Sequence, residues 1–303
     1  MNIQKLVQDK RVKDIYILAR YMYRIGKPFL DDKMFDNYEK VLLANNLIDN
    51  DLVNRSYDDD PVPYDLLREL NLEKFIISLG TDSPYAKYLD EEKSLSIQPL
   101  TNYKDIYEFC LNHRGLELIV SLKVDGINCK SLYMYGDFML SLSRARSGNG
   151  IDYTKNLSKV IPTHTDMEER EVKLFSESFV EPDYLDTLKS KYDANSYKTC
   201  RTSATSLLRV SHSPEDYEHL HTLVFNAEGL KFATISATLE YLESKGFEVV
   251  PHIVLEPNTI PRDFNEFKKF IKALCDKFAK ETIGIPSDGI VIDVNDLSFN
   301  GII

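Results

Sequence analysis

Three strand signals follow one another directly in the stretch ELIVSLKVDGINCKSLYMYGDFMLSLSRA (residues 117–145). The three runs, residues 117–124, 127–135 and 138–145, are rich in the β-branched and aromatic residues that favour strands. Short turns such as YGDF (135–138) separate them, which is typical of antiparallel neighbours. We therefore expect this stretch to form part of an antiparallel sheet.

Strand and helix signals alternate from this stretch to the C-terminal end. Further strands are expected at VKLFSESFV (172–180), HTLVFNA (221–227), GFEVVPHIVL (246–255) and GIVIDV (289–294). Amphipathic helices are expected over residues 234–245 and 262–280, where apolar residues recur at helical spacing. The pattern predicts an α+β domain of mainly antiparallel sheets with flanking helices.

The N-terminal region has a different sequence pattern, which is mainly helical. Apolar residues such as Ile15, Leu18 and Met22 recur at helical spacing, and residues 3–75 are predicted to be helical, with a polar, proline-containing loop at 54–65. No periodicity is seen over residues 78–103, which we interpret as a long connection. The sequence therefore predicts a small helical domain over residues 1–75 and a second domain over 76–303.

Composition limits the class of protein. The chain has 303 residues, of which 43% are hydrophobic and 28% are charged, so it can bury a sizeable core. It carries neither an apolar run long enough to span a membrane nor a signal peptide. The four cysteines form no CxxC pair, which favours a reduced, cytoplasmic protein (host cytoplasm, if the source is viral) without structural zinc. We assign no protein metal ligands.

The net charge of −11 also restricts the partners. Phosphate contacts are made mainly by Lys and Arg, so an acidic chain is a poor free-standing binder of nucleic acid. A polyanion would have to be held by a local basic patch or by another subunit.

The segment SLKVDGIN (121–128) contains the clearest candidate for a catalytic residue. Lys123 and Asp125 are two residues apart, so they share one face of an extended strand, and Gly126 leaves room for a ligand near the backbone. A lysine becomes a nucleophile when its environment favours the neutral amine. The alternative is an ordinary surface turn, because the K-x-D-G pattern is short enough to occur by accident.

Basic residues gather in two further segments. Arg144 leads into the Gly-Asn-Gly loop of SRARSGNGIDYTKN (143–156), where a guanidinium and a permissive backbone could bind phosphate. Arg201 and Arg209 in SYKTCRTSATSLLR (196–209) are eight residues apart and can share one helix face. Both segments could equally be solvated surface.

Taken in order, these segments resemble the NAD-dependent DNA ligases of bacteria and their viruses. LKVDG resembles the adenylation motif of the family, which makes Lys123 the residue that carries AMP. SRARSGNGID aligns with the family segment T-R-G-D-G-T-T-G-E-D and keeps Arg144, and FSESF (175–179) places Glu177 where the family binds the ribose. CRTSATSLLR (200–209) resembles P-R-N-A-A-A-G-S-L-R, and SDGIVIDVND (287–296) resembles I-D-G-V-V-I-K-V-N-D.

The N-terminal region also resembles this family. Its segment ARYMYRIGKPFLDDKMFDNYEKVL (19–42) is similar to the Y-x-Y-H…P…D-A-E-Y-D-x-L pattern of the small domain that binds nicotinamide mononucleotide (NMN). The matching residues are Tyr23, Asp32, Phe35 and Asp36, with Leu100 matching in the following linker. Carboxylates beside aromatic rings suit a cationic pyridinium. Without the resemblance, an acidic face of a helical bundle is the simpler interpretation.

The sequence departs from the family at several positions. Ser121 stands in place of the adenine-reading glutamate, and Asp293 in place of a lysine near the phosphates. The adenine-stacking tyrosine is replaced by Asn226 or Ala227, and the sequence ends at Ile303, before the last adenylation motif. The zinc finger, oligonucleotide-binding barrel, helix-hairpin-helix and BRCT modules of the family have no counterpart.

The resemblance implies a DNA ligase (NAD+) acting in DNA replication and in the repair of DNA damage. Its nucleotidyltransferase domain, an ATP-grasp-like ligase adenylation domain, would use NAD and Mg²⁺. Lys123 would attack the adenylyl phosphorus of NAD, release NMN, and pass AMP to a 5′-phosphate at a DNA nick. Asp125, Gly126, Arg144, Glu177 and Lys280 would bind the nucleotide. Arg201 and Arg209 would contact nicked DNA.

Three hypotheses stay open at this point. The first is one subunit of a split, virus-type ligase, completed by a second polypeptide that carries the last motif and an oligonucleotide-binding domain. The second is a degenerate, non-catalytic ligase partner, suggested by Ser121 and Asp293. The third is an ATP-using nucleotidyltransferase such as an RNA ligase, which would have no need for an NMN-binding domain.

Overall fold

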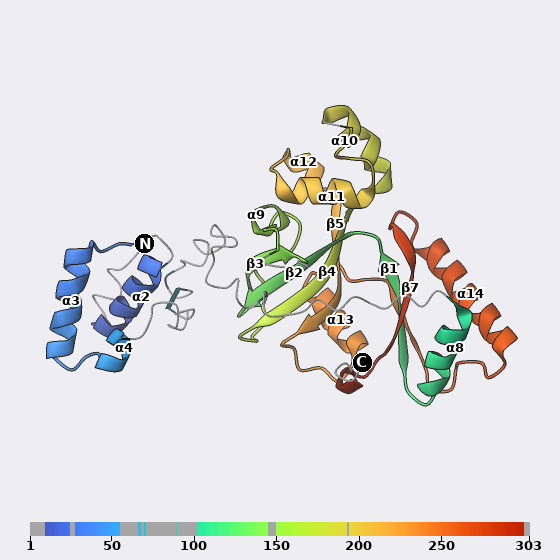
Figure 1. Ribbon diagram of the computed structural model, residues 1–303, viewed down its shortest axis with the longest axis horizontal. Coiled ribbons are helices and arrows are strands. Elements are labelled where there is room, and N and C mark those ends of the chain that lie inside the picture. The colour runs from blue at the N-terminus through green and yellow to red at the C-terminus, as the bar shows by residue number, and fades with distance from the viewer. Residues whose placement is uncertain are drawn as a thin grey trace. The chain divides into compact units, whose positions relative to one another are not determined.

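The computed structural model describes residues 10–24, 28–54, 66–67, 70, 89, 102–144, 150–192 and 194–299. Contacts divide the chain into two compact units, residues 1–88 and residues 89–303 (Figure 1). The units are described separately below. Among the described residues, no helix has both the length and the apolar character that a membrane span requires.

The first unit is built from helices. They are α2 (Val12–Arg24), α3 (Asp32–Ala44) and α4 (Asn50–Asn54). Asp31 caps α3 by accepting a hydrogen bond from the Met34 amide, which satisfies one of the free N–H groups of the first turn. Helix α2 packs on α3 through stacked rings of Tyr16 and Phe35, whose centroids are 5.5 Å apart. This apolar contact holds the two helices together.

The second unit contains a four-stranded antiparallel sheet in the order β3-β2-β4-β5. Its strands are β2 (Ile127–Met134), β3 (Asp137–Ser143), β4 (Val172–Val180) and β5 (Leu220–Glu228). A tight turn at Tyr135 and Gly136, both with positive φ, joins β2 to β3. An added Cβ at Gly136 would lie 2.3 Å from the Thr165 carbonyl oxygen, so glycine is required at this position.

A second, three-stranded sheet has the order β6-β1-β7. Its strands are β1 (Leu118–Val124), β6 (His252–Leu255) and β7 (Ser287–Val294), and both outer strands run antiparallel to β1. The strand expected over residues 246–255 is therefore too long, because only its last four residues form a strand. Val249 instead makes an isolated parallel bridge to Val224 of β5.

Helices cover the outer faces of both sheets (Figure 1). Helices α8 (Tyr103–Asn112) and α14 (Phe264–Glu281) lie side by side against β1 and β7, and the apolar residues of β1 that face them are buried. Helix α11 (Cys200–Arg209) lies on the other sheet with α9 (Thr154–Leu157), α10 (Leu185–Lys191) and α12 (Pro214–Tyr217). Helix α13 (Ile235–Ser244) and the short 3-10 turns η3 (Pro182–Tyr184) and η4 (Leu297–Phe299) complete the unit.

The predicted fold class is confirmed: the chain combines helices with antiparallel sheets. The expected strands at 117–124, 127–135 and 172–180 correspond closely to β1, β2 and β4. Helix α8 begins at Tyr103, where the interpretation as a connection ended, and the Asn102 side chain caps it by accepting from the Asp105 amide. Asn54 ends α4, and the rest of the expected loop at 54–65 lies outside the described residues, as does most of the connection at 78–103.

Candidate active site

Lys123 lies near the end of β1 and is held by a carboxylate from the neighbouring strand. Its ammonium group donates to both carboxylate oxygens of Asp288, at 2.6 and 2.7 Å. The register explains this contact, because Lys123 pairs with Gly289 of β7, directly after Asp288. The two side chains are 39% and 55% exposed, so a substrate can reach the pair from solvent.

A second ion pair lies just beyond the end of β1. The Asp125 carboxylate is 3.5 Å from the Arg201 guanidinium, and both side chains are about half exposed. Arg201 lies in the first turn of α11, where Thr199 and Thr202 form a capping box that fixes the start of the helix. The sheet and the helix thus bring Lys123, Asp125 and Arg201 into one region.

Gly126 is required for packing. A Cβ at this position would lie 2.6 Å from the Ser178 carbonyl oxygen of β4. The space beside Gly126 is therefore taken by the neighbouring strand, which corrects the expectation that it leaves room for a ligand. Only glycine permits this close approach of the two backbones.

Glu177 is the half-buried acid of this region. It lies on β4 opposite Asn128 of β2, whose amide group donates to its carboxylate at 3.3 Å. Burial raises the pKa of Glu177 to about 7, although the Asn128 hydrogen bond and the charges of Arg201 and Arg144 favour ionisation. The same charges show that both arginines lie close enough to act on this carboxylate.

Asn128 also presents an unsatisfied acceptor. Its side-chain oxygen is buried, and within the described part of the chain no donor reaches it. Buried polar groups are almost always paired, so a bound molecule could supply the donor that the described residues lack. It lies beside Glu177 and can accept a hydrogen bond from a bound hydroxyl group.

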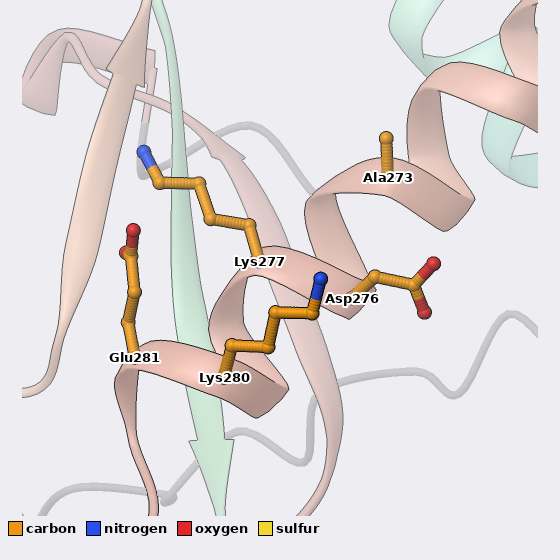
Figure 2. A pocket seen from close by; sticks show the side chains of 5 residues that line it. All are labelled: Ala273, Asp276, Lys277, Lys280 and Glu281. Carbon is orange, nitrogen blue, oxygen red and sulfur yellow. The ribbon is translucent and has the colours of Figure 1, made fainter.

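The remaining predicted nucleotide and DNA contacts are more dispersed. Arg144 follows the end of β3 and is exposed, and Arg209 lies in the last turn of α11, exposed at the opposite end of that helix from Arg201. Lys280 lies in the last turn of α14. It lines a hollow of about 400 Å³ with four other side chains of that helix (Figure 2): Ala273, Asp276, Lys277 and Glu281.

In the first unit, the predicted NMN-binding residues gather at one end of a helix pair. Tyr23 is in the last turn of α2, and Asp32 begins α3 after a short connection. Asp36 is one turn further along, and both aspartates are exposed. Phe35 is a core residue that packs on Tyr16, so burial corrects the expectation that its ring is available to a ligand. Leu100 lies outside the described residues.

The departures at Ser121 and Asp293 lie on one face of the three-stranded sheet. Along β1, Ile119, Ser121 and Lys123 share a face, and Asp293 is the register partner of Ile119. Burial raises the pKa of the Asp293 carboxyl. This face therefore carries a lysine at one end and a half-buried acid at the other.

Two residues of this region were missed by the sequence reasoning. Asp288 belongs to the segment SDGIVIDVND, but only the resemblance to a motif drew attention to it, and its contact with Lys123 spans 165 residues. Asn128 lies two residues after Gly126 on the next strand. The period of two along β2 and β4 would place it on the same face as Glu177 only once their register is known.

No group of three or more His, Cys, Asp or Glu residues is placed to hold a metal ion within the described ranges. The carboxylates nearest to Lys123 and Arg201 are single groups that are engaged in ion pairs. A metal at this site would therefore depend on oxygen atoms supplied by a substrate.

Comparisons with known proteins point to one family. The family model for the NAD-dependent DNA ligase adenylation domain matches residues 87–302. The DNA ligase of Pseudothermotoga lettingae is 27% identical over 296 residues, which cover 89% of this chain and 41% of that protein. The DNA ligase of Ehrlichia chaffeensis is 23% identical over 309 residues, covering 97% of this chain and 42% of that protein.

The chain thus spans about two fifths of the length of these curated relatives. Among solved structures, "Archaeal ATP-dependent RNA ligase - form 2" is similar with a TM-score of 0.42 and 12% sequence identity, covering 68% of this chain and 46% of that one.

Proposed function

The chain belongs to the family of NAD-dependent DNA ligase adenylation domains, and we propose that it transfers the adenylyl group of NAD to Lys123 as the first step of DNA strand sealing. The observation that carries this proposal is the pairing of Lys123 with Asp288 on neighbouring strands, beside Asp125 and Arg201. A nucleophile held by a carboxylate, next to a cation that can bind phosphate, is the arrangement that this chemistry needs.

In this step the Lys123 amine attacks the adenylyl phosphorus of NAD. A nitrogen–phosphorus bond forms, and the bond from that phosphorus to the bridging oxygen breaks, so that NMN leaves with the electron pair. The amine must lose a proton as the bond forms, and the Asp288 carboxylate is the acceptor already in contact with it. Asp288 thus positions the amine and receives its proton.

The charged neighbours have separate roles. Arg201 and Arg144 supply positive charge to the phosphate as negative charge develops on it. Glu177 and Asn128 bind the ribose, because a carboxylate and a buried amide oxygen can both accept hydrogen bonds from its hydroxyl groups. Lys280 is a more distant cation for the phosphates or the leaving group.

Magnesium fits this site as a partner of the substrate. Mg²⁺ is usually bound through one or two carboxylates together with substrate phosphates. Asp125 and Asp288 are the exposed carboxylates at the phosphate end of the site, and either could contribute one ligand. The ion would neutralise phosphate charge when bound.

The helical unit would bind the NMN half of NAD. We assign this role to residues 1–75 and the adenylation role to residues 76–303. Asp32 and Asp36 offer two exposed carboxylates for the cationic pyridinium, and Tyr23 offers a partly exposed ring at the same end of the helix pair. Phe35 anchors α3 through its contact with Tyr16.

Sealing also requires a grip on DNA. Arg209 and the exposed side of Arg201 are suited to phosphate contacts, but a net charge of −11 makes the chain a weak DNA binder by itself. We propose that an oligonucleotide-binding domain, in a second polypeptide, completes the ligase on nicked DNA.

The test is to incubate the protein with NAD labelled in its adenylate and to follow label retained on the denatured chain. We expect label from NAD and at least tenfold less from ATP. Equal labelling from ATP would favour an ATP-using nucleotidyltransferase, and no label from either would favour a non-catalytic partner.

A pair of variants tests the helical unit. Replacing both Asp32 and Asp36 by Ala should raise the NAD concentration for half-maximal labelling about tenfold, since two charge contacts with the pyridinium are lost. The matched control is Asp51→Ala, an exposed aspartate in the first turn of α4. An equal effect of the control would mean that the overall charge of the unit is responsible.

A further inference from the structure

The two sheets of the second unit meet along one short segment. Val224 of β5 donates to the Glu248 carbonyl and accepts from the Val250 amide, at 2.8 and 2.9 Å. One residue later, the Pro251 carbonyl accepts from the Leu122 amide of β1 at 3.0 Å. Residues 248–251 therefore connect β5, an edge strand of one sheet, to β1, the central strand of the other, and His252 follows directly.

His252 lies on the same face as the nucleophile. It is the register partner of Ser121, which also pairs with Val291 on its other side. Directly opposed residues of antiparallel strands place their side chains on one face, with Cβ atoms about 5 Å apart. Lys123 is two residues beyond Ser121, so all three side chains are on one face of this sheet.

The hydrogen bonding of the imidazole defines its tautomer. Nδ1 of His252 is 3.0 Å from the Val250 carbonyl oxygen. A carbonyl oxygen can only accept, so Nδ1 carries the proton and donates it. In the neutral ring the other nitrogen, Nε2, is then an acceptor. The ring is half-buried.

We propose that Nε2 of His252, together with the Ser121 hydroxyl, recognises the base of the nucleotide by accepting a hydrogen bond from the 6-amino group of adenine. This inference rests on the proposed transfer of AMP to Lys123. Two residues of a strand span about 6.6 Å, a separation suited to placing the phosphorus at Lys123 and the base at Ser121 and His252. Ser121 can donate to N1 of the ring, which is an acceptor in adenine.

The selectivity follows from the chemistry of position 6. In hypoxanthine this position is a carbonyl oxygen and N1 carries a proton, so the 6-position becomes an acceptor facing the acceptor of His252. A site that hydrogen-bonds one group rejects an analogue lacking it, because its own polar atoms are left unpaired. The pair therefore selects adenine over 6-oxopurines.

The experiment compares labelling at pH 8 from NAD and from its hypoxanthine analogue, each labelled in the purine nucleotide. The wild-type protein should prefer NAD at least tenfold. His252→Leu should reduce labelling from NAD about tenfold and bring the preference to within about threefold. His252→Gln, whose amide oxygen can accept, should restore part of the preference.

The matched control is His164→Leu, which removes a mostly exposed imidazole that pairs with Asp137. It should leave both labelling rates and their ratio unchanged. An unchanged ratio in His252→Leu, with labelling intact, overturns the inference and leaves the proposed function standing.

Equilibrium binding of AMP and of inosine 5′-monophosphate is measured in parallel, because it requires no covalent step. A preference of the wild-type protein for AMP that His252→Leu removes supports the inference even if no label is transferred. Equal binding of both nucleotides by the wild-type protein overturns it.

Discussion

Two Lys–Asp pairs in the second unit differ in almost every respect except their residue types. Lys123 and Asp288 pair at 2.6 Å near the end of a strand, with both side chains accessible. Lys191 and Asp216 pair at 2.8 Å between α10 and α12, where Asp216 is 0% exposed. Asp216 also accepts hydrogen bonds from the hydroxyl groups of three neighbours, Tyr184, Tyr192 and Ser213.

The two pairs differ in the number of hydrogen bonds that the aspartate accepts. An aspartate with several donors has a structural role, whereas one with a single partner can exchange that partner for a substrate. Burial by itself would raise the pKa of Asp216, but the hydrogen bonds from Lys191 and its other donors outweigh burial and hold that pKa well below its usual range. Removing any of these donors leaves the buried Asp216 carboxylate with an unsatisfied hydrogen-bonding position. Among the described residues Asp288 is paired with Lys123, and its side chain is 55% exposed, so a substrate can displace or share this contact at little cost.

The largest effect is expected for the nucleophile. Lys123→Ala should reduce AMP attachment at least 1000-fold, because the nucleophile itself is lost, while the melting temperature changes by less than about 2 °C, as expected for an exposed pair. The comparison variant, Lys191→Ala, should lower the melting temperature by several degrees and leave labelling of the folded protein unchanged. Full labelling of Lys123→Ala would show that another residue carries AMP.

Asp216→Ala should destabilise the second unit by about 3 kcal/mol, because it leaves four donors without their common acceptor. The loss should appear at neutral pH in urea unfolding. A folded-state pKa below the unfolded value stabilises the protein above about pH 4, and this stabilisation is lost as the pH falls. If the variant unfolds like the wild-type protein, the cluster does not have the structural role described here.

Asp288→Asn should slow AMP attachment by about 10–100-fold, since an amide can orient the lysine but accepts a proton poorly. Circular dichroism should show an unchanged unfolding midpoint. Labelling is measured at saturating NAD, which separates slow transfer from weak binding. A normal rate at saturation would assign Asp288 to substrate binding alone.

The smallest effect is expected at Glu177, which is half-buried, whereas Asp216 is fully buried and receives more hydrogen bonds. Its pKa is raised to about 7 mainly by burial. Ionisation therefore costs stability as the pH rises from the unfolded pKa near 4.5 through 7, and Glu177→Gln should be more stable than the wild-type protein at pH 8 by about 1 kcal/mol. The advantage should disappear near pH 4. Labelling should fall severalfold as the ribose contact weakens.

Local patterns in the sequence predicted most of the elements around Lys123. Alternation and turn residues identified β1 to β4, and helical spacing identified α13 and α14. The strand expected from residue 246 was too long because a run such as FEVVPHIVL reads as one strand, although Val249 bridges to one sheet and His252 pairs with the other. Which sheet a residue joins depends on tertiary structure.

In the site, too, local sequence patterns predicted some features, while others depend on tertiary structure. Period two predicted one strand face for Lys123 and Asp125, but β1 ends at Val124 and its register shifts after Lys123. Helical spacing placed Arg201 in a helix, as α11 shows. The partners Asp288 and Asn128 were missed because they depend on registers between strands that are distant in sequence. Phe35 was assigned to a ligand from its motif, but its apolar ring is more stable against Tyr16 in the core.

The segment shared by the two sheets also constrains motion in this part of the protein. Glu248 and Val250 hydrogen-bond to Val224, and Pro251 hydrogen-bonds to Leu122. Because these residues lie within four positions of one another, the segment ties the two sheets together. A change in the angle between the two sheets would have to bend the backbone of residues 248–251 or break these hydrogen bonds. The amide hydrogens of Leu122, Val224 and Val250 should consequently be among the last of this unit to exchange with solvent.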